Sequence, residues 1–503
     1  MQNETGAPPP SANTSAARQA VAAILLLVVW CTVRASSLPG SLWSDEIASY
    51  WFAKQPLSLL WSNWMVRETN PPLYYTILKG WMSAFGESDL ALRGPSLLCG
   101  LFTAMLAGQV ARERAGMAAG WFAIVLVSLS SAQIYYSLDV RAYALAELAA
   151  LAALWSADRF VRSRADDFGW RALALYILAC SMALYSHTML AVFWVITGSW
   201  TGLWLLLQRA SWRRRIAPWV AANAAVALLW SWWIRITLWQ IGHPAGIAWI
   251  TRPTLPVALR DVMEIYGPGP RFGAGGLFYF AWAGFGLVAL LVLLQAIRRL
   301  RADFALVYPV AALSAPVLLY LVSFKTPVLI PRAFLWGAAP LQVSLAIGLA
   351  SLPLGLVRRL CGMVLPASYL AGTLALINHP TEEPYRQIAA EIRQRDPHAA
   401  VVTNQGIAAL ALARYCPRPA CSLHVYLIRR PEQLPVAPAA TYLDLAEAPQ
   451  LLRENPVLFS LVRLEAYDPG TELARTARPI VLAGNRQTGD ALVLSRWERA
   501  PER

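Results

Sequence analysis

The sequence predicts a polytopic α-helical membrane protein that ends in a small α/β domain. Of the 503 residues, 57% are hydrophobic and only 14% are charged, which is too little charge to cover the surface of a water-soluble protein of this length. The apolar residues come in blocks of about 17–24, long enough to cross a hydrocarbon core of about 30 Å. The last long apolar run ends near residue 378, and the rest of the chain is more polar. We therefore expect a membrane domain over 1–378 and a soluble domain over 379–503.

Eleven apolar runs are predicted to cross the membrane, at residues 19–36, 90–110, 117–136, 141–157, 171–187, 188–207, 218–236, 273–296, 305–323, 333–351 and 363–378. The first run could instead be a cleaved signal peptide. Its length, and the absence of a positive charge before Arg18, favour an uncleaved helix.

Arginine clusters lie between alternate spans, at "RER" 112–114, at residues 159–164, at "RRR" 213–215, at "RRLR" 298–301 and at "RR" 358–359. The positive-inside rule places all of these loops in the cytoplasm. The N-terminus is then cytoplasmic and the C-terminal domain lies outside. The net charge of +14 thus reflects membrane topology, and no nucleic-acid partner is predicted. Forty arginines against three lysines, with abundant Ala and Trp, are typical of a GC-rich bacterial genome, which favours the inner membrane and a periplasmic tail.

The tail alternates between helical and strand-like segments, as expected for a small α/β domain. Helices are predicted at 384–395 and 406–415, and strands at 399–403, 422–428, 478–484 and 491–497. Cys416 and Cys421 flank the short "CPRPAC" loop and could form a disulfide in an oxidising compartment. The other four cysteines lie in or beside apolar spans. The chain has no CxxC, HExxH or histidine cluster, so no metal site is predicted.

The first outside loop, residues 37–89, is rich in tryptophan and holds the adjacent carboxylates Asp45 and Glu46 in "SLWSDEIASY". Tryptophan at this density suits short helices in the membrane interface. An acidic pair in a loop is often only solvated charge. At a membrane edge among apolar neighbours, however, a carboxylate is costly unless it has a partner or a function.

Two further outside loops carry charges. Asp139 and Arg141 lie in "YYSLDVRAYAL", where a structural pairing that fixes the helix turn is the simpler interpretation. Lys325 and Arg332 lie in "FKTPVLIPRAFLW", where they could anchor at lipid headgroups or hold a phosphate.

These segments together resemble a known family. "WSDE" after the first span, "NPPLYY", "GESDLALRGPSLLCG" and "YYSLDVRAYAL" are similar in order and membrane depth to motifs of glycosyltransferase family 39. That family comprises the dolichyl-phosphate-mannose-protein-mannosyltransferase-like proteins, which are relatives of the lipid A aminoarabinose transferase. The resemblance implies a GT-C architecture whose active site faces the periplasm or ER lumen. It also implies a sugar donor carried on a polyprenyl phosphate and a lipid, glycan or protein acceptor. No cofactor is expected, and a divalent metal requirement stays open. Some relatives have Lys or His where this chain has Asn70, and Glu where it has Asp139.

The resemblance also suggests roles for individual residues. Asp45 would be the general base, Glu46 would orient its neighbour or the acceptor, and Asp139 would be a second carboxylate at the site. The leaving lipid phosphate needs cations, for which the candidates are Arg141, Arg332 and Lys325. Further substrate contacts are expected from Tyr74, Tyr75, Arg93 and His187, although packing is an alternative role for the tyrosines and the histidine.

Two other functional classes stay open from the sequence. A lipid or polyprenyl-phosphate-sugar transporter would also need charges near its spans, but it usually has internal repeats, and no motif occurs twice in this chain. A catalytically inactive lipid-binding relative is the second alternative, against which the presence of both Asp45 and Glu46 argues.

Overall fold

The structure is a computed structural model. It describes residues 12–38, 40–163, 169–208, 212–243, 250–269, 276–353, 355–378, 384–403, 405–417, 421, 423–428, 441–443, 451, 454–455, 457–463, 477–483 and 492–499. The chain forms two compact units. The larger comprises 1–38, 56–86 and 93–380, and the smaller comprises 39–55, 87–92 and 381–503. Two short segments near the N-terminus, 39–55 and 87–92, thus belong with the C-terminal part of the chain.

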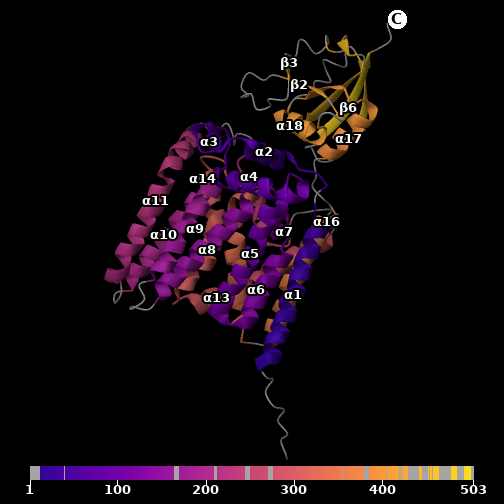
Figure 1. The fold of residues 1–503 in the computed structure, drawn as a ribbon. Coiled ribbons are helices and arrows are strands. Elements are labelled where there is room, and N and C mark those ends of the chain that lie inside the picture. Colours follow the sequence, from indigo (N-terminus) through magenta and orange to yellow (C-terminus); the bar gives the residue numbers. More distant parts are fainter. Residues whose placement is uncertain are drawn as a thin grey trace, which may run out of the picture. The chain divides into compact units, whose positions relative to one another are not determined.

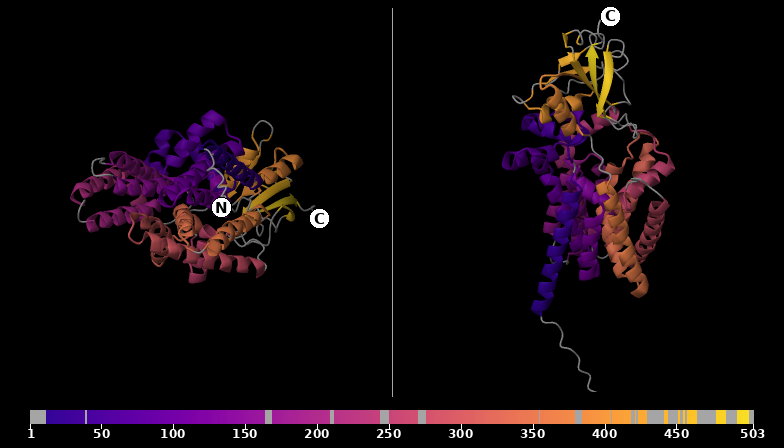
Figure 2. Two further views of the ribbon diagram at one scale, coloured as in Figure 1. Left: turned by 90° about the horizontal axis from the view of Figure 1, so that it is seen from below. Right: turned by 90° about the vertical axis from the view of Figure 1, so that its right-hand side faces the viewer.

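The larger unit is a helical bundle, and Figures 1 and 2 show most of its helices running side by side. Its helices are α1 (Ala12–Ser36), α3 (Leu57–Leu60), η1 (Asn63–Arg67), α4 (Leu73–Phe85), α5 (Asp89–Ala115), α6 (Met117–Leu129), α7 (Ser131–Leu138), α8 (Tyr143–Arg162), α9 (Trp170–Ser186), α10 (Leu190–Leu207), α11 (Trp212–Gly242), α12 (Leu255–Tyr266), α13 (Gly276–Leu300), η3 (Phe304–Leu306), α14 (Val307–Ser323), η4 (Pro331–Gly337), α15 (Ala338–Ala350) and α16 (Gly355–Asn378). The first four residues of α5 fall in the smaller unit.

Among the described residues, eight helices are long and apolar enough to cross a membrane, or nine if α6 and α7 count as one broken span. The count of eleven is therefore not reached. Helices α6 and α7 are bent by 62° at Ser130. Helix α9 has only 17 residues, and α8 carries Glu147 and Asp158, both buried, among its apolar residues. The prediction of a multi-spanning helical membrane protein with a small C-terminal sheet domain is confirmed.

Two groups of buried polar side chains in the bundle are paired with one another. Gln133 Nε2 donates to Glu147 Oε1 at 2.5 Å, and the same oxygen accepts the Ala339 N–H at 3.0 Å. A second group surrounds Arg114, which forms ion pairs with the buried Asp158 and with Asp303. Such pairing offsets the high cost of placing polar groups in an apolar interior.

The smaller unit contains α2 (Ser44–Lys54) and an α/β fold (Figure 2, right, orange and yellow). The α/β part comprises α17 (Tyr385–Arg395), β1 (Ala400–Thr403), α18 (Gly406–Tyr415), β2 (His424–Ile428), β3 (Thr441–Leu443), β4 (Val457–Arg463), β5 (Ala477–Ala483) and β6 (Leu492–Arg499). The strands form one sheet in the order β3-β2-β1-β4-β6-β5. β1 is parallel to both β2 and β4, β2 is parallel to β3, and β6 is antiparallel to β4 and β5. Both helices and four strands predicted for the tail are present, whereas β3 and β4 were not predicted.

Candidate active site

The acidic pair lies in the first turn of α2, in the smaller unit. Trp43 is the N-cap residue, and Glu46 occupies the third helical position. The Trp43 N–H donates to Glu46 Oε2 at 3.1 Å, and the Glu46 side chain is almost completely buried. Asp45 is half-buried. Carboxylates in the first turn are favoured by the exposed backbone N–H groups and the helix dipole, which explains why α2 begins here.

A second group of predicted residues meets in the larger unit. Arg141, in the short connection between α7 and α8, is buried, and its Nη1 donates to Tyr75 Oη at 3.3 Å. Its Nη2 lies 3.4 Å from Glu68 Oε1, and its guanidinium carbon lies 5.9 Å from the centre of the Tyr143 ring. The Tyr143 ring is 5.7 Å from that of His187, the C-cap residue of α9. We call Glu68, Tyr75, Arg141, Tyr143 and His187 the Arg141 cluster.

The segment that carries Glu68 is fixed on both sides. Glu68 Oε1 accepts the Asn70 N–H at 3.1 Å and the Asn70 amide at 3.2 Å. Gln240 of α11 donates to the Glu68 carbonyl at 2.7 Å, and Thr188 donates to the Thr69 carbonyl at 3.0 Å. Asn70 therefore holds the carboxylate of Glu68 through two hydrogen bonds.

Arg332 lies beside the Arg141 cluster. It is the second residue of η4, which packs against α8 and α12, and its side chain is partly buried. The charges of Arg332 and Arg141 both act on the His187 ring. Glu68 offsets part of the charge of Arg141, and Arg332 adds a second positive charge to this part of the bundle, which favours an anion because arginine binds phosphate well.

The other predicted residues are more scattered. Asp139 is the C-cap residue of α7 and is buried two residues before Arg141. The Tyr74 hydroxyl is 2.8 Å from that of Ser96, which donates to the Arg141 carbonyl at 3.3 Å. Arg93 is buried on α5, whereas Lys325 is exposed after the end of α14. Lys325 is thus the predicted cation with the least support from the geometry.

Two carboxylates of interest, Glu68 and Glu264, were not predicted to have a role. Glu264 lies on α12 and is partly buried, and burial raises its pKa to about 7, with the Asp261 charge acting in the same direction and Arg260 opposing it. Its charge and that of Arg332 both act on the Tyr136 hydroxyl of α7. The signal for Glu68 was its place two residues before the "NPPLYY" segment, but nothing in the sequence singled out Glu264.

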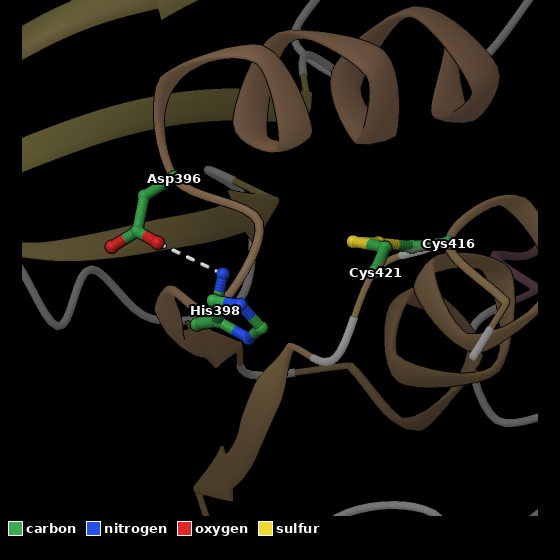
Figure 3. Close-up of a disulfide and its surroundings, with 4 residues drawn as sticks. All are labelled: Asp396, His398, Cys416 and Cys421. Atoms are coloured by element: carbon green, nitrogen blue, oxygen red, sulfur yellow. Dashed lines mark hydrogen bonds between the residues drawn. A yellow bond between two sulfur atoms is a disulfide. The ribbon is translucent and has the colours of Figure 1, made fainter. Parts of the chain in front are cut away.

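No group of three or more His, Cys, Asp or Glu side chains that could hold a metal ion occurs in the described part of the chain. Cys416, the C-cap residue of α18, forms a disulfide with Cys421, and their Cα atoms are 5.2 Å apart (Figure 3). In the nearby turn after α17, the His398 N–H donates to Asp396 Oδ1 at 2.8 Å (Figure 3).

Comparison with known proteins identifies the fold. The structure matches ArnT from Cupriavidus metallidurans in the apo state with a TM-score of 0.65 at 14% identity, covering 96% of this chain and 98% of that one. ArnT bound to undecaprenyl phosphate matches with a TM-score of 0.61 at 15% identity, covering 95% and 98%. The oligosaccharyltransferase AglB from Archaeoglobus fulgidus matches with a TM-score of only 0.45 at 10% identity, covering 95% and 74%, which is too low to support an argument. No protein-family model and no curated protein matches the sequence. The chain therefore has the GT-C fold that its motifs indicated.

Proposed function

We propose that this protein is a membrane glycosyltransferase that takes its sugar from a polyprenyl-phosphate donor and transfers it to a lipid, glycan or protein acceptor. The observation that carries the proposal is the likeness to ArnT over nearly the whole of both chains. One of those ArnT structures holds undecaprenyl phosphate, the type of leaving group that the proposed reaction releases. The motifs around Asp45, Asn70 and Asp139 support the same function.

The donor phosphate is assigned to the Arg141 cluster and Arg332. Both guanidinium groups are at least partly buried, where a charge-assisted hydrogen bond is stronger than in water. Burial raises the pKa of Tyr75 well above its usual value, so its hydroxyl stays neutral and available for hydrogen bonding. These groups would stabilise the charge that develops on the leaving phosphate.

Asp45 is assigned as the general base. Its carboxylate takes the proton of the acceptor hydroxyl while the acceptor oxygen forms a bond to the anomeric carbon of the sugar. The bond from that carbon to the phosphate oxygen breaks, and its electron pair leaves with the polyprenyl phosphate. Acid–base assistance of this kind contributes roughly 10²–10⁴-fold to a rate. Asp139 is the second candidate for the base.

The proposal requires a sidedness that can be measured. The protein would lie in the bacterial inner membrane, with residues 1–378 as the membrane domain and 379–503 as a periplasmic domain. Single cysteines at the accessible positions 45 and 325 should react with an impermeant thiol reagent from outside, and cysteines at the exposed positions 214 and 359 only from the cytoplasm. Labelling of position 45 from the cytoplasm would refute the mechanism.

The decisive test is a transfer assay. Membranes that carry the protein receive radiolabelled undecaprenyl-phosphate-linked hexoses and pentoses, and label entering envelope lipids and proteins is counted. Asp45→Asn should lower transfer roughly 10²–10⁴-fold but leave the binding of undecaprenyl phosphate unchanged, since the lost group acts on the acceptor proton.

Other outcomes contradict the proposal in distinct ways. Transfer by Asp45→Asn at the wild-type rate, with loss in Asp139→Asn, would give the base role to Asp139. Movement of the donor between leaflets without transfer would indicate a transporter. Binding of undecaprenyl phosphate with neither activity would indicate a catalytically inactive relative.

A further inference from the structure

The beginning of helix α2 is held by residues that lie more than 340 positions later in the chain. The Leu42 N–H, one residue before the N-cap, donates to the Tyr415 hydroxyl at 2.8 Å. Ser44 Oγ is 3.2 Å from the Tyr385 hydroxyl, and the Arg386 N–H donates to Ser41 Oγ at 3.3 Å. All of these residues belong to the smaller unit. The turn that presents Asp45 is therefore attached directly to α17 and α18.

Asp89, at the beginning of α5, connects these contacts. Arg414 Nη2 donates to Asp89 Oδ1 at 2.6 Å, and the Tyr415 hydroxyl donates to Asp89 Oδ2 at 2.7 Å. Arg386 forms a further ion pair with the same carboxylate. The side chains of Arg414 and Asp89 are each only 9% exposed. A nearly buried ion pair with several donors has a well-defined geometry, and removing one partner is costly.

The body and the C-terminal end of α2 are fixed by Glu87 and Arg414. Lys54 Nζ and the Tyr50 hydroxyl each donate to the Glu87 carboxylate at 2.6 Å. Burial acts to raise the pKa of Glu87, but these two hydrogen bonds and the charges of Lys54 and Arg414 outweigh it, so the pKa lies below its usual value and the carboxylate stays ionised. The Arg414 guanidinium carbon lies 4.2 Å from the centre of the Tyr50 ring. Arg414 thus contacts both Asp89 and the body of α2.

We propose that Arg414 and Tyr415 are positioning residues for catalysis, so that the C-terminal domain is part of the catalytic machinery. Neither side chain touches the reacting atoms. They hold α2, and α2 sets the place of the Asp45 carboxylate. Because a displacement of about 1 Å at a catalytic group can lower a rate roughly 10²-fold, loosening this attachment should reduce turnover. The inference rests on the proposed role of Asp45.

The test uses the full-length protein in nanodiscs and the transfer assay described above. Tyr415→Phe removes only the hydroxyl that joins Leu42 to Asp89 and should lower kcat roughly 10-fold. Arg414→Ala should lower kcat roughly 100-fold, with partial recovery in Arg414→Lys. The KM for the donor should change little in all three, because the Arg141 cluster is untouched. Arg395→Ala, in an exposed pair with Glu391 on α17, is the control and should leave kcat unchanged.

A double variant separates a positioning role from general loss of stability. If Tyr415 acts through Asp45, then Tyr415→Phe should have little further effect in an Asp45→Asn background. If the kcat losses of Tyr415→Phe and Asp45→Asn multiply fully in the double variant, the inference is overturned. It is also overturned if Tyr415→Phe and Arg414→Ala both keep the wild-type kcat while Asp45→Asn is inactive. Wild-type transfer by Asp45→Asn would overturn the proposed function itself. Tyr415→Phe is conservative enough to fold, and its thermal unfolding temperature should stay close to that of the wild type.

Discussion

Replacing Glu264 with glutamine tests whether a titrating carboxylate controls donor binding. Glu264 lies on α12, outside the candidate spans, and its pKa is raised to about 7 first by burial and then by the charge of Asp261. Asp261, three residues earlier, lies on the same face of the helix. A group with this pKa passes from about one tenth ionised at pH 6 to about nine tenths ionised at pH 8.

The sign of the effect follows from the neighbouring cation. Glu264 and Arg332 are both close enough to the Tyr136 hydroxyl to act on it, and Arg332 is proposed to bind the donor phosphate. An ionised Glu264 repels that phosphate, so donor binding should weaken as the pH rises through about 7. A unit charge roughly 10 Å away in an effective dielectric of about 20 contributes about 1.7 kcal/mol. Salt screening reduces this to about half, which corresponds to about a fourfold increase in Kd.

The assay measures binding of undecaprenyl phosphoglucose to the protein in nanodiscs at pH 6, 7 and 8. This probe is a phosphodiester, and its charge stays constant over that range, unlike that of a phosphate monoester with a second pKa of about 6. The wild-type Kd should rise about threefold between pH 6 and pH 8, because Glu264 is not fully neutral at pH 6 or fully ionised at pH 8, and the Kd of Glu264→Gln should stay constant. Asp261→Asn, which removes one cause of the raised pKa, should move the inflection below pH 7. The same pH dependence in Glu264→Gln as in the wild type would refute the reasoning.

Three further predictions concern other parts of the molecule. Arg332→Ala should weaken binding of undecaprenyl phosphoglucose by about 1.5–3 kcal/mol, since a charge-assisted contact is lost, and should slow transfer as well; a fall in transfer with unchanged binding would contradict a phosphate contact. Asp158→Asn removes one of the two carboxylates paired with the buried Arg114 and should lower the free energy of unfolding by about 3–5 kcal/mol, against about 1 kcal/mol or less for the exposed Glu391→Gln. Thermal unfolding of both variants in detergent compares their stabilities. Equal decreases in unfolding temperature would show that the buried ion pair stabilises the protein no more than the exposed one. Cys416 should resist thiol trapping until a reductant is added, and a freely reactive Cys416 would exclude the disulfide.

Most of the local structure could be predicted because it depends on local patterns. Helix α18 and strand β1 follow directly from short apolar runs bounded by Gly and polar residues. Strand β4 was missed although its sequence, "VLFSLVR", is strongly apolar. It lies between β1 and β6, so residues on both of its faces are buried and the alternation typical of a half-exposed strand is absent. The order of the strands depends on pairing between distant segments, which no local pattern encodes.

The same limit applies to the site. Arg141 and Asp139 could be predicted because charges between apolar helices are conspicuous. The partner of Arg141 could not, because Glu68 lies 73 residues away in the chain. Asp89 and Arg414 are 325 residues apart, and only the folded chain brings them together. A sequence identifies which side chains are costly to bury, and the structure identifies which of them meet.

The two neighbouring carboxylates of α2 have different physical roles. Glu46 is 1% exposed, and its Oε2 accepts the Trp43 N–H, so it completes the beginning of the helix. Asp45 precedes it by one residue, which turns its side chain by about 100° around the helix axis, and it is less buried. Glu46 is thus engaged with the backbone at the beginning of the helix, and Asp45 is the more accessible of the two carboxylates. This difference supports the assignment of the proposed general base to Asp45 rather than to Glu46. If Asp45 is the base as proposed, its position depends on Glu46 from within the helix and on Arg414 and Tyr415 from outside it.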